Sequence, residues 1–498
     1  MNKVALIVLD GWGVRSNKKS NAIVAAKPHF FHSLITNNLF KTLHASGTAV
    51  GLPKGTIGNS EVGHLHISAG RVITQELELI NREIKSGAFY RNTVLLNAIK
   101  RAKNSRLHFI GLVSDGGVHS HVRHLFALMN LARKHGLSDV VIHAITDGRD
   151  VAQKSACIYL KQIERKLESG WKIGSLIGRW YAMDRDKRWN REQKAYSALV
   201  NETGMATKNW KNAIHKSYAR GKTDEFVKPI ITAPDSRIRD GDVVIFFNYR
   251  ADRARELVDA FVKEKFSKFK RNYFSKLHFV CMTEHSLSLP MAVAYPHLEI
   301  NNSLGEVISK RGLKQMRIAE TEKWAHVTYF FNGLSNKVFK GEKRVLIPSP
   351  KVSTYDLVPA MKAKEIANVA IKSFANNIPF TLINFANADM VGHTAKMKPC
   401  MRAIKAVDAG LKKIVTAALK QNVEVIITAD HGNAEQLAYA DGSPMTSHTN
   451  SPVPFIIVSS RFKKLCWVKN AGLANVAPTV LKIMGLPKPR EMSAKALV

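Results

Sequence analysis

The sequence predicts an α/β protein: a doubly wound, mainly parallel sheet domain that is split in the sequence, with a second α/β domain inserted into it. Strand and helix patterns alternate nearly throughout the chain. At 498 residues the chain exceeds one ordinary hydrophobic core, so two domains are expected. Residues of metal-ligand type fall before about residue 75 or after about residue 300. The predicted domains are therefore 1–74 with 298–498, and 75–297.

Acidic residues follow three apolar strands of the split domain. The run 4–9 ends at Asp10, the run 423–429 ends at Asp430-His431, and the run 380–386 leads to Asp389 and His393; His448 comes later. In an open α/β sheet, ligands bind outside the carboxyl ends of the strands. We therefore expect these side chains to converge. Three carboxylates, three imidazoles and a serine oxygen suffice for two divalent ions.

A serine between small residues is the candidate nucleophile. Ser60 lies in the stretch Gly58-Asn59-Ser60-Glu61-Val62-Gly63-His64, where a helix is expected to begin near Asn59. A helix N-terminus directs free N–H groups and a positive dipole end at a phosphate. The stretch alone is equally consistent with a simple N-cap. A serine hydroxyl needs a base or a metal to become a nucleophile, so its partners decide the matter.

The predicted insertion has its own alternation of strands and helices. We expect strands at 107–113, 140–145, 172–177, 243–247 and 277–282, with helices at 76–85, 121–135, 155–167 and from Asp252 onward. A helix from about Ser303 restarts the first domain. The two crossings, near Thr74 and near Leu298, are expected to lie side by side and act as a hinge.

Arginines at the ends of the inserted strands indicate an anionic ligand. Such arginines, with glycines beside them, suit bidentate binding of phosphate or carboxylate oxygens. Any one of them could instead form a surface ion pair with a nearby aspartate. Five at strand ends favour the binding interpretation. These segments are Ser114 to His121, Thr146 to Asp150, Gly178-Arg179, Met183 to Trp189 and Phe247 to Arg253.

The charge balance is extreme, with 75 Lys+Arg against 39 Asp+Glu and a net charge of +36. This charge raises the alternative of a nucleic-acid or other polyanion partner. The densest basic run, 263–276, interleaves aromatic residues at roughly helical spacing, which predicts a solvated basic helix with an aromatic inner face. Basic residues are otherwise spread along the whole chain. Nucleic-acid binding is therefore not expected.

Cysteine usage and apolar segments predict a cytoplasmic protein. The four cysteines form no CxxC pair and are interpreted as reduced core thiols. The apolar run 4–9 is too short for a signal peptide, and no apolar segment is long enough to span a bilayer.

Taken together, the motifs resemble those of cofactor-independent phosphoglycerate mutase, a branch of the alkaline phosphatase superfamily, over nearly the whole chain. The motifs are Asp10-Gly11-Trp12-Gly13, Gly58 to His64, Ser114 to His121, Asp147 to Asp150, Met183 to Trp189, Ala319 to Lys323, Asp389 to His393 and Asp430 to Glu435. The resemblance implies interconversion of 3-phosphoglycerate and 2-phosphoglycerate in glycolysis and gluconeogenesis, independent of 2,3-bisphosphoglycerate and through a phosphoserine on Ser60.

The resemblance also implies a role for each site residue. One metal would be held by Asp389, His393 and His448, and a second by Asp10, Ser60, Asp430 and His431. The substrate would be held by His119, Arg149, Asp150, Arg179, Arg185, Arg250, Arg253 and Lys323. Manganese is the metal that the family usually uses, and a monomer is expected. Asp150, ahead of His119, is the candidate general acid or base.

Other interpretations stay open from the sequence alone. A metal-dependent phosphohydrolase or a phosphopentomutase would fit the split domain equally well, and only the motifs of the insertion speak against both. A polyanion-binding protein on an inactive mutase fold is supported by the charge alone. His64 and His66 are expected to form local hydrogen bonds, and Glu61 and Glu435 are expected behind the metal ligands.

Overall fold

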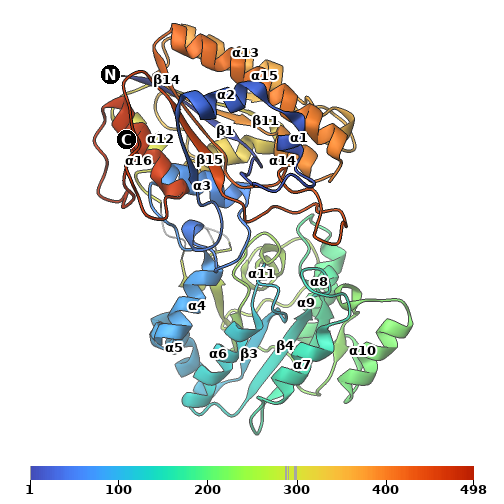
Figure 1. Ribbon diagram of the computed structural model, residues 1–498. Coiled ribbons are helices and arrows are strands. Elements are labelled where there is room, and N and C mark those ends of the chain that lie inside the picture. The colour runs from blue at the N-terminus through green and yellow to red at the C-terminus, as the bar shows by residue number, and fades with distance from the viewer. Residues whose placement is uncertain (1, 286–288, 290, 297–299) are drawn as a thin grey trace. The chain divides into compact units, whose positions relative to one another are not determined.

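The computed structural model describes residues 2–285, 289, 291–296 and 300–498. The chain folds into two compact units: unit 1, Met1–Gln75 with Glu299–Val498, and unit 2, Glu76–Leu298. Each unit has its own sheet with helices around it (Figure 1). The predicted crossing near Leu298 lies outside the described residues.

Unit 1 is built on a mixed, mainly parallel sheet. In spatial order its strands are β12 (Glu342–Ile347), β11 (Gln315–Glu320), β13 (Phe380–Phe385), β1 (Lys3–Leu9), β14 (Val423–Thr428), β15 (Val453–Val458) and β2 (Leu39–Leu43). The first five run parallel, β15 is antiparallel to β14, and β2 is antiparallel to β15. Residues 4–9 of β1 are buried, which is why that strand reads as a continuous apolar run.

Helices cover both faces of this sheet. They are α1 (Ala22–Ala26), α2 (His29–Asn37), α3 (Ser60–Ala69), α12 (Leu304–Lys310), α13 (Ala363–Ala375), α14 (Asn387–Gly392), α15 (Met397–Lys420) and α16 (Val476–Met484). The helices α1, α2 and α13 pack against α15, whereas α12 and α16 pack against α3 (Figure 1). Their apolar faces and the sheet form one continuous core.

The helix that carries Ser60 begins where the sequence predicts. The side chain of Asn59 accepts a hydrogen bond from Val62 N at 2.9 Å and so caps α3. At the other end, Gly70 takes the left-handed conformation with φ 64°, which terminates the helix.

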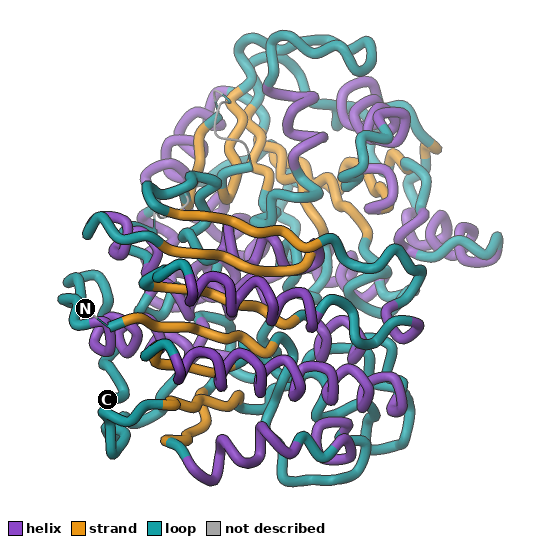
Figure 2. The backbone as a smooth tube through the Cα atoms, turned by 90° about the horizontal axis from the view of Figure 1, so that it is seen from above, coloured by secondary structure: helices purple, strands orange, loops and turns teal. Residues whose placement is uncertain are grey.

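Unit 2 has a second mixed, mainly parallel sheet with helices around it (Figure 2). In spatial order its strands are β10 (Ala292–Tyr295), β9 (His278–Thr283), β8 (Val243–Phe246), β3 (Leu107–Leu112), β4 (Val140–Thr146), β5 (Lys172–Gly178), β7 (Ile230–Ile231) and β6 (Met205–Ala206). Its helices are α4 (Glu76–Ser86), α5 (Thr93–Arg101), α6 (Val122–Lys134), α7 (Ala156–Glu164), α8 (Arg179–Ala182), α9 (Trp189–Asn201), α10 (Trp210–Ala219) and α11 (Arg255–Val262). The strands β10 to β5 run parallel, and β7 is antiparallel to β5.

Two local predictions are wrong. The basic run 263–276 forms no helix; its rings Phe266 and Phe269 instead pack irregularly against Trp189 and Tyr196 of α9. Side-chain anchoring to a neighbouring helix therefore overrides the local periodicity.

The cysteines are unpaired, but Cys466 is exposed rather than in the core. None of the helices in the described part of the chain is long and apolar enough to cross a membrane.

Candidate active site

Three buried aspartates lie at one edge of the unit 1 sheet. Asp10 directly follows β1, Asp430 follows β14 after one residue, and Asp389 lies in α14 just after β13. These strands are neighbours in the order β13-β1-β14, and their parallel register aligns their carboxyl ends. The three side chains are at most 2% exposed. The predicted convergence of these acids is confirmed.

Ser60 faces this cluster from the first turn of α3. Its Oγ lies 3.2 Å from Asp10 Oδ1 and 2.9 Å from His431 Nε2. Lys323 Nζ donates to the same oxygen at 2.8 Å. An acid, an imidazole and an ammonium thus surround a buried hydroxyl at a helix N-terminus, where negative charge is favoured.

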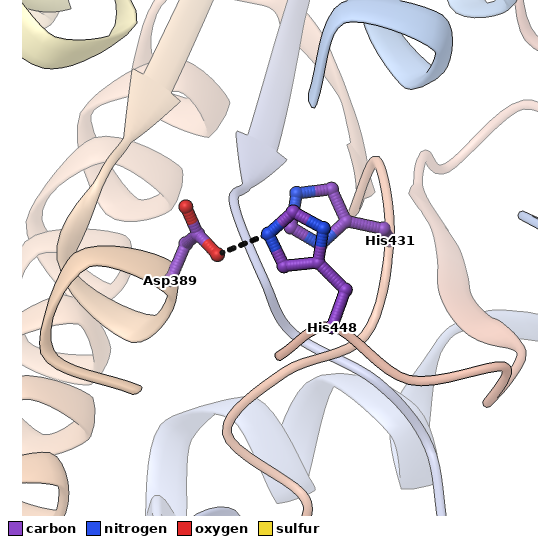
Figure 3. Close-up of side chains that lie close together, drawn as sticks. All are labelled: Asp389, His431 and His448. Atoms are coloured by element: carbon purple, nitrogen blue, oxygen red, sulfur yellow. Dashed lines mark ion pairs between the residues drawn. The ribbon is translucent and has the colours of Figure 1, made fainter. Parts of the chain in front are cut away.

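The first predicted ligand set has its donor atoms close together. Asp389 Oδ1 lies 3.2 Å from both His393 Nε2 and His448 Nε2, and the two Nε2 atoms are 3.2 Å apart. The other nitrogen of each ring, Nδ1, is oriented by a backbone carbonyl. His393 Nδ1 lies 2.7 Å from Thr446 O, and His448 Nδ1 lies 3.0 Å from Gly58 O. Figure 3 shows the Asp389–His448 contact, with the ring of His431 stacked beside His448.

The second predicted set surrounds Ser60. His431 Nε2, besides its contact with Ser60, lies 3.6 Å from Asp10 Oδ1 and 3.5 Å from Asp430 Oδ2. His431 also lies near the first set, and Asp389, His431 and His448 form a group compatible with one ion. His431 Nε2 also contacts Ser60 Oγ, so His431 lies between the two predicted sets. The two sets therefore adjoin.

His64 and His66 behave differently from each other. His66 Nδ1 lies 2.7 Å from Val62 O and its Nε2 accepts from Ile73 N at 2.9 Å, so both nitrogens are satisfied locally. Burial lowers the pKa of His66 to about 4. His64 Nδ1, in contrast, lies 2.9 Å from Ser60 O and 3.3 Å from Asp430 Oδ2. Asp10, His64 and Asp430 form a further group compatible with an ion, and the sequence did not single out His64 for that position.

Lys323 belongs to this cluster of unit 1. Its Nζ lies 2.6 Å from Asp10 Oδ1 and 2.6 Å from Asp389 Oδ2. Burial opposes the charged ammonium, but the aspartates raise the pKa of Lys323 above its usual value. Burial likewise opposes the charged form of Asp389, yet Lys323 holds the pKa of that carboxyl well below its usual range.

The donor set fits divalent cations. Carboxylate, imidazole and hydroxyl groups converge without any thiolate, a combination that suits hard to intermediate divalent ions. Within the described chain, Asp430 Oδ2 is buried and accepts no well-aligned hydrogen bond, although two imidazoles lie 3.3 and 3.5 Å away. A buried carboxylate oxygen without a donor is costly unless a cation satisfies it.

The predicted substrate residues, Lys323 excepted, all lie in unit 2, around the ends of its central strands. Four of them, Arg149, Arg179, Arg185 and Arg253, line a cavity of about 240 Å³. Arg179 is 3% exposed, and its Nη1 lies 2.7 Å from Asp147 Oδ1 and 2.6 Å from Asp150 Oδ2. The cavity thus combines one rigid, buried guanidinium with more exposed ones.

Asp252 contacts three of the predicted substrate residues. Its carboxylate lies 3.6 Å from His119 Nδ1, 3.3 Å from Arg185 Nη1 and 3.2 Å from Arg250 Nε. Burial, together with the charge of Arg179, lowers the pKa of His119 to about 4. The sequence indicated Asp252 only as a helix start, whereas α11 begins three residues later, at Arg255. Arg188 and Arg191 also line the cavity. Arg188 belongs to the segment Met183 to Trp189 singled out from the sequence, whereas no predicted segment included Arg191.

Comparisons with known proteins find relatives that match nearly the whole chain. The family model described as the N-terminus of BPG-independent PGAM matches residues 80–287. The 2,3-bisphosphoglycerate-independent phosphoglycerate mutase of Moorella thermoacetica is 46% identical over 502 residues, covering 99% of this chain and 98% of the relative. The enzyme of that name numbered 1 in Methanosarcina acetivorans is 47% identical over 505 residues, with 99% and 98% covered.

A solved structure shares the whole architecture. Leishmania mexicana phosphoglycerate mutase, crystallised at low cobalt concentration, aligns with a TM-score of 0.74 and 33% identity over 100% of this chain and 98% of that one. Its similarity confirms the α/β fold with two mainly parallel sheets. With near-complete coverage of relatives at this identity, the chain belongs to the 2,3-bisphosphoglycerate-independent phosphoglycerate mutase family.

Proposed function

We propose that Ser60 accepts the phosphoryl group of a phosphoglycerate and returns it to the other hydroxyl of the same glycerate. Family membership makes the chain a phosphoglycerate mutase, which interconverts 3-phosphoglycerate and 2-phosphoglycerate. The observation that carries the phosphoserine route is the surroundings of Ser60 Oγ: Asp10, His431 and Lys323 all lie within 3.2 Å.

The residues of unit 1 supply the phosphoryl-transfer site. Asp389, His393 and His448 would hold one divalent ion, and Asp10, Ser60, Asp430 and His431 a second. Such ions lower the pKa of a bound hydroxyl and neutralise charge on the phosphoryl oxygens. We propose that both ions are Mn²⁺. Lys323 Nζ, 2.8 Å from Ser60 Oγ, would stabilise both the attacking alkoxide and the transferred phosphoryl group.

The chemical step is a displacement at phosphorus. Ser60 Oγ gives up its proton and forms a bond to phosphorus while the bond from phosphorus to the glycerate oxygen breaks, and that oxygen takes up a proton. In the second half, the other glycerate hydroxyl loses a proton and its oxygen forms a bond to phosphorus, while the bond from phosphorus to Ser60 Oγ breaks and Ser60 takes its proton back. Asp150 and His119 are the candidates for carrying these protons, since Asp150 Oδ2 and His119 Nε2 are 3.9 Å apart in the substrate cluster.

Unit 2 would hold the glycerate while Ser60 carries the phosphoryl group. The guanidinium groups of the cluster provide bidentate donors for a carboxylate. Retention of glycerate matters, because loss of this small acid would leave phospho-Ser60 to water and turn the mutase into a phosphatase. We further propose that the protein is a monomer in the cytoplasm and has no nucleic-acid partner.

The experiment is a coupled mutase assay with and without 2,3-bisphosphoglycerate, after chelation and metal add-back, with Ser60→Ala beside the wild type. We expect turnover without bisphosphoglycerate, loss on chelation, best recovery with Mn²⁺ and no turnover by Ser60→Ala. Turnover that needs bisphosphoglycerate would contradict the phosphoserine route. Release of inorganic phosphate from 3-phosphoglycerate faster than formation of 2-phosphoglycerate would favour a hydrolase.

A further inference from the structure

Glu435 is a fully buried carboxylate that contacts three separate segments of unit 1. Its Oε2 accepts hydrogen bonds from Gly13 N at 3.1 Å and from Asn433 N at 2.8 Å. Its Oε1 accepts a short hydrogen bond from Thr449 Oγ1. The first segment follows β1, the second follows β14, and the third precedes β15. The side chain therefore joins its own loop to one 14 residues further along the chain and to one 422 residues before it.

Each of these segments carries proposed metal ligands. The segment at Gly13 begins with Asp10, the segment at Asn433 begins with Asp430 and His431, and the segment at Thr449 contains His448. Backbone bonds reinforce the junction, since Ala434 N donates to Gly11 O at 3.0 Å and Thr449 N donates to Gly432 O at 3.0 Å. Movement of Glu435 would consequently shift ligands of both sets at once.

Two glycines make room for this carboxylate. A Cβ atom at Gly13 would lie 2.3 Å from Glu435 Cδ, and one at Gly432 would lie 2.4 Å from Glu435 Oε1 and 2.3 Å from Thr449 Oγ1. Any larger residue would push the carboxylate away from the loops. The local sequence is thus fitted to a carboxylate at this point, and not merely tolerant of one.

The donors to Glu435 are all neutral. Among the described residues, no Lys, Arg or His side chain forms an ion pair with it. Burying a carboxylate without a cationic partner costs free energy, so a residue used only for packing would be better served by an apolar side chain. The bonds that it makes instead are those that fix loop positions. A buried acid whose hydrogen-bond donors are all neutral therefore indicates a role in fixing the positions of these loops.

We propose that Glu435 is a positioning residue, which holds the three ligand-bearing loops in the arrangement that binds the divalent ions. The proposal rests on the proposed function of those ligands. Residues that orient metal ligands typically account for 10- to 100-fold in metal affinity. The substrate arginines belong to unit 2, so the same change should leave substrate affinity nearly untouched.

The test compares Glu435→Ala and Glu435→Gln with the wild type by equilibrium dialysis against Mn²⁺. We expect the Mn²⁺ Kd of Glu435→Ala to rise about 10- to 100-fold. Glutamine keeps an oxygen for the two N–H donors and an amide for Thr449 Oγ1, which can rotate to accept. Glu435→Gln should therefore stay within about threefold of the wild type. At saturating Mn²⁺, KM for 3-phosphoglycerate should change less than about twofold in both variants.

A matched control separates positioning from general stability. Glu342 is also buried in unit 1 and accepts from Phe339 N and Asn332 Nδ2, both at 3.0 Å. Unlike Glu435 it also pairs with Arg344 Nε, at 2.6 Å, and it starts β12, away from the carboxyl ends. Glu342→Gln should lower Tm without changing the Mn²⁺ Kd. If Glu435→Ala does not fold, Thr449→Val removes the hydrogen bond to Glu435 Oε1, together with the one that Thr449 Oγ1 accepts from Ser451 N, and should still weaken Mn²⁺ binding at least about threefold.

Several outcomes would overturn the inference. One is a wild-type Mn²⁺ Kd in Glu435→Ala or Thr449→Val. Another is a Glu435→Gln variant as weak as Glu435→Ala, which would assign the effect to charge. Failure of the underlying function looks different: the wild type would bind no Mn²⁺, or Ser60→Ala would keep its turnover. A wild type that binds Mn²⁺, an inactive Ser60→Ala and an unaffected Glu435→Ala together would reject the positioning role alone.

Discussion

The ligand cluster of unit 1 and the arginine cluster of unit 2 stand at equivalent places in two similar sheets, yet they differ in burial. Asp10, Asp430 and His431 are fully buried and held by several hydrogen bonds. In contrast, the Arg185 and Arg250 side chains are 50% and 44% exposed. Rigid, buried groups suit stabilisation of a transition state, while exposed side chains lose entropy when they grip a ligand. The difference predicts that substitutions in the two clusters affect different kinetic constants.

The largest effect is expected from Asp430→Asn. The change keeps the shape of the side chain but removes a charge that would face both Ser60 and a divalent ion. Because metal-assisted stabilisation supplies several kcal/mol, turnover should fall by roughly 1000-fold or more. Steady-state kinetics at saturating Mn²⁺ provide the measurement. A loss below about tenfold would show that the buried cluster is not the site of chemistry.

Arg179 differs from Arg185 and Arg250 because it is buried, and Arg179→Met tests how much its guanidinium contributes to stability. Removing this buried guanidinium leaves Asp147 and Asp150 without their shared cation. Breaking a buried ion pair typically costs about 3–5 kcal/mol, so the free energy of unfolding should fall by that amount. Urea denaturation followed by circular dichroism measures it. An unchanged urea midpoint would show that Arg179, like the exposed Arg185 and Arg250, contributes little to stability.

Arg250→Met is expected to act on substrate binding alone. Its guanidinium is half exposed and, within the described part of the chain, forms an ion pair only with Asp252, at 3.2 Å, so stability should change by less than about 1 kcal/mol. Losing a charged hydrogen bond to glycerate costs about 1.5–3 kcal/mol, which raises KM by roughly 10- to 100-fold. Comparing kcat and KM with those of Asp430→Asn checks the contrast. A fall in kcat with constant KM would break it.

The smallest expected effect is the pH dependence of unit 2 stability. Burial, with His121 nearby, lowers the pKa of His124 to about 3, and its ring is packed by Tyr249 and hydrogen-bonded to Asn81. Because the unfolded chain takes up this proton near pH 6.5 and the folded chain does not, stability is full above pH 6.5 and is lost as pH falls toward 3. The loss at pH 5 is about 2 kcal/mol.

Urea unfolding of the wild type and of His124→Gln at pH 7.5 and pH 5 measures this contribution. The variant should be less stable at pH 7.5 but should lose less stability between the two pH values. Equal losses in both proteins would show that other groups carry the acid sensitivity of unit 2.

Much of the architecture was readable from local pattern. Apolar runs that end in an acid, such as the one before Asp10, predicted both parallel strands and the edge at which their carboxyl ends meet. The helix start at Asn59 followed from capping chemistry. The aromatic spacing of 263–276 misled, because rings anchored on another helix produce the same spacing as an amphipathic helix.

The sequence by itself determined the fold class, the family and the sheet edge at which the acids gather, because periodicity and residue chemistry are local properties of the chain. Only the tertiary structure decided that Lys323 reaches Ser60, that Asp252 joins His119 to two arginines, and that Glu435 joins three loops. These contacts depend on how strands and loops distant in sequence come together, and an ångström-scale distance between two side chains has no local signature.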